Sequence, residues 1–364
     1  MRILDKYILK ELSGSFLFGV AAITSVFIGS DTLFRIAQYV TQYGASFVLV
    51  TKMLIYSLPG IIVLTFPISM LLASLLSFGK LSSSGEITAM KSGGISFYRL
   101  AMPVFIAAFI ISLITVAINE KVVPASRAAY NYTVRVEIQK NFTPRSQEHI
   151  VIKDISSGKM ERLVYARKFE QSTGVMSNVT MQEFEDDVMV RIQNASKVVW
   201  ETGRWIMYDG TINELSRDDR KIERTFTFKE QVMPMTRTPQ NVAREQKSMQ
   251  EMNIRELKQH IELLKMDNVD SSRQQVELHQ RISIPMACFI FALIGVPLGV
   301  TGNRSSTSIG FGISVVIIFI YYIFLAVFGA MGQGGAIPAV ISAWMPNLVA
   351  FLAGIYLIRR VASK

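Results

Sequence analysis

Long apolar stretches without a charged side chain divide the sequence. They cover residues 12–30, 53–79, 100–119, 282–303 and 305–358. A helix needs about 20 apolar residues to cross the roughly 30 Å hydrocarbon core of a bilayer, so each of the first four suits one crossing. The fifth is more than twice the length required for one crossing, and the glycines and proline of 329–338 are residues that end helices. The sequence therefore predicts six transmembrane helices.

Between the third and fourth helices the pattern changes to short runs in which apolar and polar residues alternate. These runs cover 149–153, 162–167, 188–192, 197–200, 204–208 and 225–229. Period-two alternation indicates β-strands, and six or more strands in about a hundred residues favour a β-sandwich, a jelly roll or a partly open barrel. Asp209–Gly210 predicts a hairpin turn. Helical patterns over 125–139 and 253–265 flank the strands.

Aromatic residues of these strands, Trp200 and Trp205 among them, are expected to line one face of the sheet. They form either a core only or a slot that receives an acyl chain, because both need the same residue types.

Composition and charge place the chain in a membrane. Half of the residues are hydrophobic (50%), 18% are charged, and the mean hydropathy is +0.32. The segment 120–281 holds 26 of the 38 Lys and Arg residues and 24 of the 28 Asp and Glu residues, which leaves 12 basic and 4 acidic residues elsewhere. The net charge of +10 therefore lies mainly on short loops, as the positive-inside rule describes, and not on a face for nucleic acid.

The basic residues of the short loops fix the expected orientation. One side collects Arg2, Lys6, Lys10, Lys80, Lys91, Arg99, Arg304, Arg359, Arg360 and Lys364. The other side, outside the middle segment, has Arg35 and Lys52. We expect both termini in the cytoplasm and the middle segment outside, which in a double-membraned bacterium is the periplasm.

No residue pattern typical of catalysis is present. The three histidines, His149, His260 and His279, have no metal-ligand spacing, the single Cys288 has no partner for an intramolecular disulfide, and no P-loop motif occurs. We therefore predict no catalytic residues, no metal site and no cofactor, and the chain is not expected to be an enzyme.

Two places carry candidate functional charges. Between the second and third apolar stretches, Ser83 or Ser84 is expected to cap a short helix that holds Glu86 in its first turn and ends at Gly93. Glu86 is either a functional carboxylate or a solvated charge that only favours the helix start. At the outer end of the first helix, Asp31 and Arg35 lie one turn apart.

Asp31 and Arg35 either neutralise each other, or Arg35 together with Lys52 binds an anionic head group that enters from the outer leaflet.

Motifs spread over the whole chain resemble the YjgP/YjgQ permeases, LptF and LptG, of lipopolysaccharide export. The matching segments are Leu-Asp-Lys-Tyr at 4–7, Gly-Glu-Ile-Thr-Ala-Met-Lys-Ser-Gly at 85–93, Asn-Glu-Lys-Val-Val-Pro at 119–124, His-Gln-Arg-Ile-Ser-Ile-Pro at 279–285 and Gly-Val-Pro-Leu-Gly at 295–299. The resemblance implies an α+β membrane protein: transmembrane helices 1–3 with a coupling helix at about 83–93 in residues 1–124, a periplasmic β-jelly-roll-like domain in 125–278, and transmembrane helices 4–6 in 279–364.

The resemblance also implies partners and roles. The exporter would contain an LptF-like and an LptG-like subunit, two copies of the cytoplasmic ATPase LptB, and a periplasmic bridge with LptC and LptA. Lipopolysaccharide would leave the outer leaflet of the inner membrane. Glu86 falls at the coupling-helix carboxylate that sits in a groove of the ATPase, and Arg35 at a basic position that faces the lipid's phosphates. Asp31 departs from a basic residue found there in some LptF proteins, and the motifs do not separate LptF from LptG.

Two other interpretations stay open from the sequence. One is an ABC permease that transmits motion but conducts no lipid. The other is a membrane-anchored enzyme of the envelope, which the missing catalytic residues disfavour.

Overall fold

The computed structural model describes residues 3–138, 148–156, 159–170, 173–185, 188–216, 222–235, 237–239, 242, 247–266, 269–301 and 307–363. Arg2, Arg304 and Lys364, which belong to the predicted charge pattern, lie outside these residues. The chain forms two compact units: Met1–Thr133 together with Ser272–Lys364, and Val134–Ser271. We call them the helical bundle and the sheet unit, and describe each by itself.

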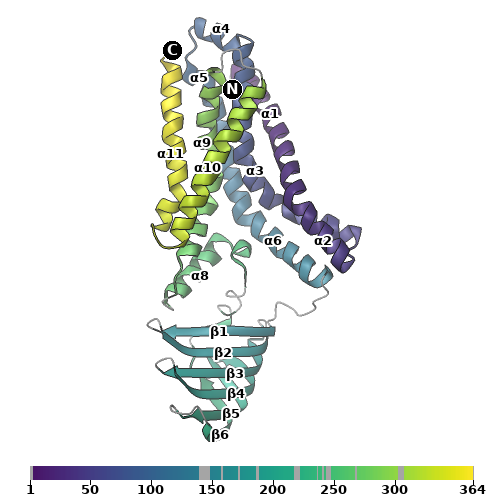
Figure 1. Ribbon diagram of the computed structural model, residues 1–364, viewed down its shortest axis with the longest axis vertical. Helices are drawn as coiled ribbons and strands as arrows, with labels where there is room; N and C mark the ends of the chain where they lie inside the picture. The colour runs from purple at the N-terminus through teal and green to yellow at the C-terminus, as the bar shows by residue number, and fades with distance from the viewer. Residues whose placement is uncertain are drawn as a thin grey trace. The chain divides into compact units, whose positions relative to one another are not determined.

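Among the described residues, six helices of the bundle are long and apolar enough to cross a membrane, which agrees with the predicted number. The first consists of α1 (Ile3–Phe27), the π-helical η1 (Ile28–Thr32) and α2 (Leu33–Tyr43), and the second is α3 (Phe47–Ser83). The third joins α5 (Phe97–Ala117), η2 (Ile118–Val122) and α6 (Val123–Tyr132). The last three are α9 (Ser272–Thr301), α10 (Thr307–Gln333) and α11 (Ala339–Ala362). Both chain ends lie at the end of the bundle that holds the short helix α4 (Glu86–Ser92) (Figure 1).

Helices α3 and α9 form the centre of the bundle. In both, 72% of the most apolar window is buried, against 11% for the first helix and 17% for α10. A pair of glycines one turn apart on α9 allows the two helices to pack this closely. A Cβ atom on Gly295 would lie 2.9 Å from the carbonyl oxygen of Leu71, and one on Gly299 would lie 2.8 Å from that of Leu75. Because neither glycine has a side chain, the two backbones approach closely, as small residues permit between membrane helices.

A proline in α9 is accommodated by a neighbouring helix. Pro285 has no N–H, so the carbonyl of Arg281, four residues earlier, loses its helical donor. The side-chain amide of Asn119, in η2, donates to this carbonyl at 2.9 Å. The missing hydrogen bond is thus replaced from the next span, as membrane helices require.

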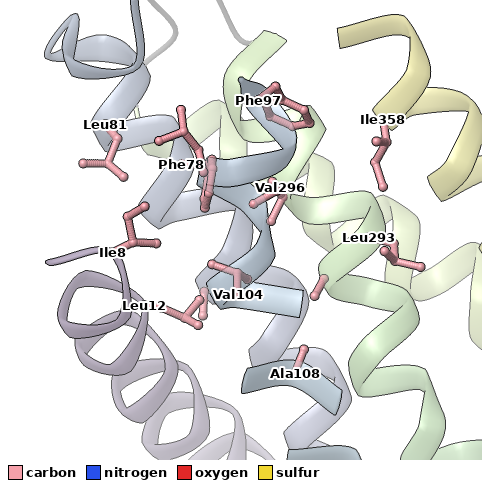
Figure 2. Close-up of a cluster of buried hydrophobic side chains, with 14 of the residues drawn as sticks. Ile8, Leu12, Phe78, Leu81, Phe97, Val104, Ala108, Leu293, Val296 and Ile358 are labelled. Carbon is pink, nitrogen blue, oxygen red and sulfur yellow. The ribbon is translucent and has the colours of Figure 1, made fainter. Parts of the chain in front are cut away.

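A large apolar cluster fills the end of the bundle near α4 (Figure 2). Its members come from five of the spans and from α4, and all are buried. They include Ile8 and Leu12 of α1, Phe78 and Leu81 of α3, Ile87 of α4, Phe97 and Val104 of α5, Leu293 and Val296 of α9, and Ile358 of α11. This cluster fixes the short helix to the spans around it.

The sheet unit contains one six-stranded antiparallel sheet in which each strand pairs with the next along the chain. The strands are β1 (Glu148–Ser156), β2 (Lys159–Glu170), β3 (Val175–Glu185), β4 (Val188–Glu201), β5 (Arg204–Leu215) and β6 (Ile222–Met233). Strand β3 is an addition to the predicted runs, and two predicted runs merge into β4. The α+β class is confirmed, whereas the jelly-roll form stays a prediction, because the described strands make a single sheet in sequential order. The flanking helical segments are α6 with η3 (Thr133–Ile138) and α8 (Ile254–Met266).

The predicted hairpin turn at Asp209–Gly210 is wrong. Both residues lie inside β5, where Gly210 pairs with Ala195 and Phe228. A Cβ atom on Gly210 would collide with the Asn194 carbonyl and the Phe228 ring, so glycine is needed there for close approach and not for a turn.

The turn between β4 and β5 is Thr202–Gly203, where both φ angles are positive (50° and 83°). Positive φ at both central residues is what a two-residue type I′ hairpin requires.

Candidate functional site

The short helix predicted between the second and third spans is present as α4, but its cap differs from the prediction. The N-cap residue is Gly85, whose φ of 77° is left-handed, and no side chain caps the helix. Ser84 instead donates its hydroxyl to Oε1 of Glu86 at 2.8 Å. At the other end Gly93 donates its N–H to the Ala89 carbonyl, and Gly94 has a φ of 81°. Glycine residues therefore connect α4 to the chain on both sides.

Glu86 is half-buried and is held by a second hydroxyl. Tyr7, in the second turn of α1, donates to Oε2 of Glu86 at 2.9 Å. Each carboxylate oxygen thus accepts one hydroxyl hydrogen bond within the chain. A carboxylate offers about four lone-pair sites, so capacity remains for a further cationic or N–H donor.

Two ion pairs flank this hydrogen bond. Glu11 Oε1 lies 2.7 Å from Lys80 Nζ near the end of α3, and Asp5 Oδ1 lies 2.7 Å from Arg99 in the first turn of α5. The three contacts Asp5–Arg99, Tyr7–Glu86 and Glu11–Lys80 make up what we call the polar seam. Sequence reasoning did not find it. The available signal was that three of the four acidic residues outside the middle segment, Asp5, Glu11 and Glu86, belong to it.

The helix α2, which carries another candidate residue, lies at the opposite end of the bundle (Figure 1). Arg35 is an exposed residue of α2, beside the exposed Leu33 and Phe34, and Lys52 is a half-buried residue near the start of α3. The turn between these helices contains Gly44, which has a φ of 63°. Asp31 belongs to η1, but its side chain lies outside what the structure describes. Exposed apolar residues beside a basic one suit a membrane interface.

The aromatic face of the sheet is filled by its own side chains. Trp205 is fully buried, its ring packs edge-on against those of Phe169 and Trp200, and its indole N–H donates to the Arg237 carbonyl at 2.6 Å. In this structure these aromatic residues form a core. Among the residues that the structure describes, no group of three or more His, Cys, Asp or Glu side chains is placed to hold a metal ion.

Six apolar helices of membrane length, with an antiparallel sheet inserted in the chain between helices, define a multi-pass membrane protein. Comparison of the sequence with protein families makes this specific. The chain belongs to the family described as lipopolysaccharide export system permease LptF/LptG, which matches residues 6–360.

Relatives from two bacteria carry the same description. The chain is 25% identical over 320 residues to lipopolysaccharide export system permease protein LptG of Escherichia coli (strain K12), covering 84% of this chain and 83% of the relative. It is 24% identical over 318 residues to LptF of the same strain, covering 83% and 80%. It is 19% identical over 354 residues to LptG of Haemophilus influenzae, covering 95% of each. Family and helices together make this a multi-pass inner-membrane protein and a permease component of lipopolysaccharide export.

Proposed function

We propose that this chain is the membrane-spanning subunit of an ABC-type lipopolysaccharide exporter. In this proposal residues 1–124 and 279–364 span the membrane with both termini in the cytoplasm, and residues 125–278 form the periplasmic domain. Two copies of an LptB-like ATPase bind at the cytoplasmic end, and a second LptF/LptG-type permease completes the membrane part. Lipopolysaccharide leaves the outer leaflet of the inner membrane and passes to a bridge of LptC- and LptA-like proteins. The family match over residues 6–360 carries the proposal.

The ATPase is proposed to engage α4 through Glu86. This carboxylate stands on a two-turn helix with glycine on both sides, and its orientation is set by the hydroxyls of Tyr7 and Ser84. A fixed carboxylate at the end of a helical bundle suits a basic groove of a partner protein. Closure of the ATPase pushes α4, and this rigid-body movement narrows a cavity for the lipid between the two permease subunits.

The lipid is proposed to meet Arg35 and Lys52 at the opposite end. Guanidinium and ammonium groups bind phosphate, and both residues belong to helices that adjoin a single turn containing Gly44. The exposed Leu33 and Phe34 beside Arg35 suit acyl chains. A lipid held here favours a conducting permease over one that only transmits motion.

One purification tests the partners. We expect the chain, tagged at its C-terminus and extracted gently, to retain an ABC ATPase, a second six-span permease and lipopolysaccharide, all identified by mass spectrometry. Recovery of the permeases and ATPase without lipopolysaccharide would favour the rival that conducts no lipid. Recovery of the chain alone would contradict the exporter.

Variants at Glu86 and at Arg35 separate ATPase binding from lipid binding in that purification. Glu86→Ala should reduce the recovered ATPase on the order of tenfold, because a charge-assisted contact is lost. Glu262→Ala, a change of an exposed acid in α8, is the control. Arg35→Ala should reduce bound lipopolysaccharide while the ATPase stays, with the exposed Arg360→Ala as its control. Normal ATPase recovery and normal export by Glu86→Ala would refute the role of Glu86.

A further inference from the structure

The polar seam joins the first helix to every part of the segment that carries α4. From α1, Asp5 reaches Arg99 of α5, Tyr7 reaches Glu86 of α4, and Glu11 reaches Lys80 of α3. Only the Tyr7 contact touches α4 itself. Tyr7 is therefore the side chain through which α1 holds the carboxylate that we propose for ATPase binding.

The covalent path from α4 into the neighbouring spans passes through glycine on both sides. Gly85 has a φ of 77° and Gly94 a φ of 81°, and glycine is the residue with the widest backbone freedom. Movement of α4 is therefore weakly transmitted along the chain itself. Side-chain contacts transmit it better, and they include the packing of the buried Ile87 and the hydrogen bond from Tyr7.

Apolar packing makes the α4 end of α1 a firm attachment. Ile8 and Leu12 are 1% and 3% exposed, and they share one cluster with Leu81 and Phe97 (Figure 2). Ile87 of α4 belongs to the same cluster. Close-packed clusters of this kind move as a unit and do not deform smoothly. A displacement of α4 must therefore displace this end of α1 as well.

The rest of the first helix packs on α3, where the Phe16 ring meets that of Phe66 and Thr24 donates to Thr65, and it reaches the other end of the bundle. Besides Ile8 and Leu12, the buried residue of α1 is Gly19. Helix continues without a break from α1 through η1 into α2, which carries Arg35 (Figure 1). A continuous helix that is held firmly at its α4 end carries a tilt of that end to its far end.

We infer that Tyr7 is a positioning residue that orients Glu86 and couples movement of α4 to the first helix, and thereby to Arg35. This inference rests on the proposed function of Glu86. The polar seam then acts as the link between the ATPase-facing end and the lipid-facing end of the permease.

Tyr7→Phe tests the link, because it keeps the ring and removes only the hydroxyl. Tyr98→Phe is the matched control, since Tyr98 is an exposed tyrosine (53%) at the same end of the bundle. Each variant is assembled with its ATPase and second permease in lipopolysaccharide-loaded proteoliposomes. ATP hydrolysis and transfer of lipopolysaccharide to a soluble acceptor are measured on the same sample.

We expect Tyr7→Phe to assemble normally and to transfer about threefold less lipopolysaccharide per ATP hydrolysed, the scale of one lost hydrogen bond. A merely structural role would lower both rates together with the amount of complex, and would leave their ratio unchanged. An unchanged ratio, with or without loss of complex, overturns the inference.

Glu86→Ala run in parallel separates the two claims. If Glu86→Ala loses the ATPase while Tyr7→Phe keeps the ratio of the Tyr98→Phe control, the coupling by Tyr7 fails and the role of Glu86 stands. If Glu86→Ala retains the ATPase and exports normally, the role of Glu86 fails, and the inference about Tyr7 fails with it.

Discussion

The helical bundle and the sheet unit achieve close packing in opposite ways. Between α3 and α9 the contact depends on having no side chain, at Gly295 and Gly299. In the sheet unit the contact depends on large side chains, such as the fully buried Trp205 and Phe169. Lipid tails are as apolar as leucine, so membrane helices gain from close backbone approach, whereas a sheet in water gains from each buried apolar surface. The contact between α3 and α9 is therefore sensitive to added side-chain volume, whereas the core of the sheet unit is sensitive to lost volume.

The largest expected effect is a loss of volume in the sheet unit. Trp205→Ala should lower the free energy of unfolding of this unit by about 3–5 kcal/mol, because it removes a fully buried ring and leaves the Arg237 carbonyl without its indole donor. Denaturant titration of the whole chain in detergent measures it, followed by tryptophan fluorescence on a Trp344→Phe background, so that only the sheet unit contributes to the signal. Phe226→Ala, at a residue 47% exposed on β6, is the control and should cost much less. Equal losses for the two variants would contradict the core role of Trp205.

An intermediate effect is expected from a gain of volume in the bundle. Gly299→Ala places a methyl group 2.8 Å from the Leu75 carbonyl oxygen and 2.9 Å from the Gly79 nitrogen, so α3 and α9 must separate. We expect a loss of about 1–3 kcal/mol, seen as a lower temperature at which the detergent-solubilised protein leaves the monodisperse peak in size-exclusion chromatography.

Gly14→Ala is the matched control for Gly299→Ala, because a Cβ atom on Gly14 of α1 meets nothing within 4 Å. Alanine favours helix over glycine, so this control should be neutral or stabilising. If both alanine variants behave alike, close approach of α3 and α9 does not hold the bundle together.

Features that depend on local composition were predictable from the sequence. The six spans followed from apolar length and missing charge, and α4 followed from a candidate serine cap, an acidic residue in the first turn and Gly93 at the end. The fold class followed from the change of period between the third and fourth spans. In each case neighbouring residues decide the structure, so a single sequence contains the information.

Features that depend on distant pairing were missed or misplaced. The partners of the polar seam lie far apart in the chain, 69 residues for Glu11 and Lys80 and 79 for Tyr7 and Glu86, and no periodic pattern links them. Asp209–Gly210 has the composition of a hairpin turn, but cross-strand crowding by Asn194 and Phe228 decides its place inside β5. Ser84 has the composition of a cap, yet its hydroxyl donates to Glu86. Glu86, Arg35 and Lys52 were chosen from the charge pattern, Glu86 and Arg35 also from family motifs, and their roles stay proposals.

The smallest expected effect is a pH dependence confined to the sheet unit. Burial lowers the pKa of His260 in α8 below its ordinary value of about 6.5, because the half-buried imidazole is harder to charge, and in the described part of the chain its buried Nδ1 has no hydrogen-bond partner. The unfolded state therefore binds more protons below about pH 6.5, and stability of this unit should decrease as the pH falls through that value. Tryptophan-monitored melting between pH 7.5 and 5.5 should show a steeper decrease for the wild type than for His260→Gln. Parallel decreases would show that His260 does not contribute to the pH dependence of stability.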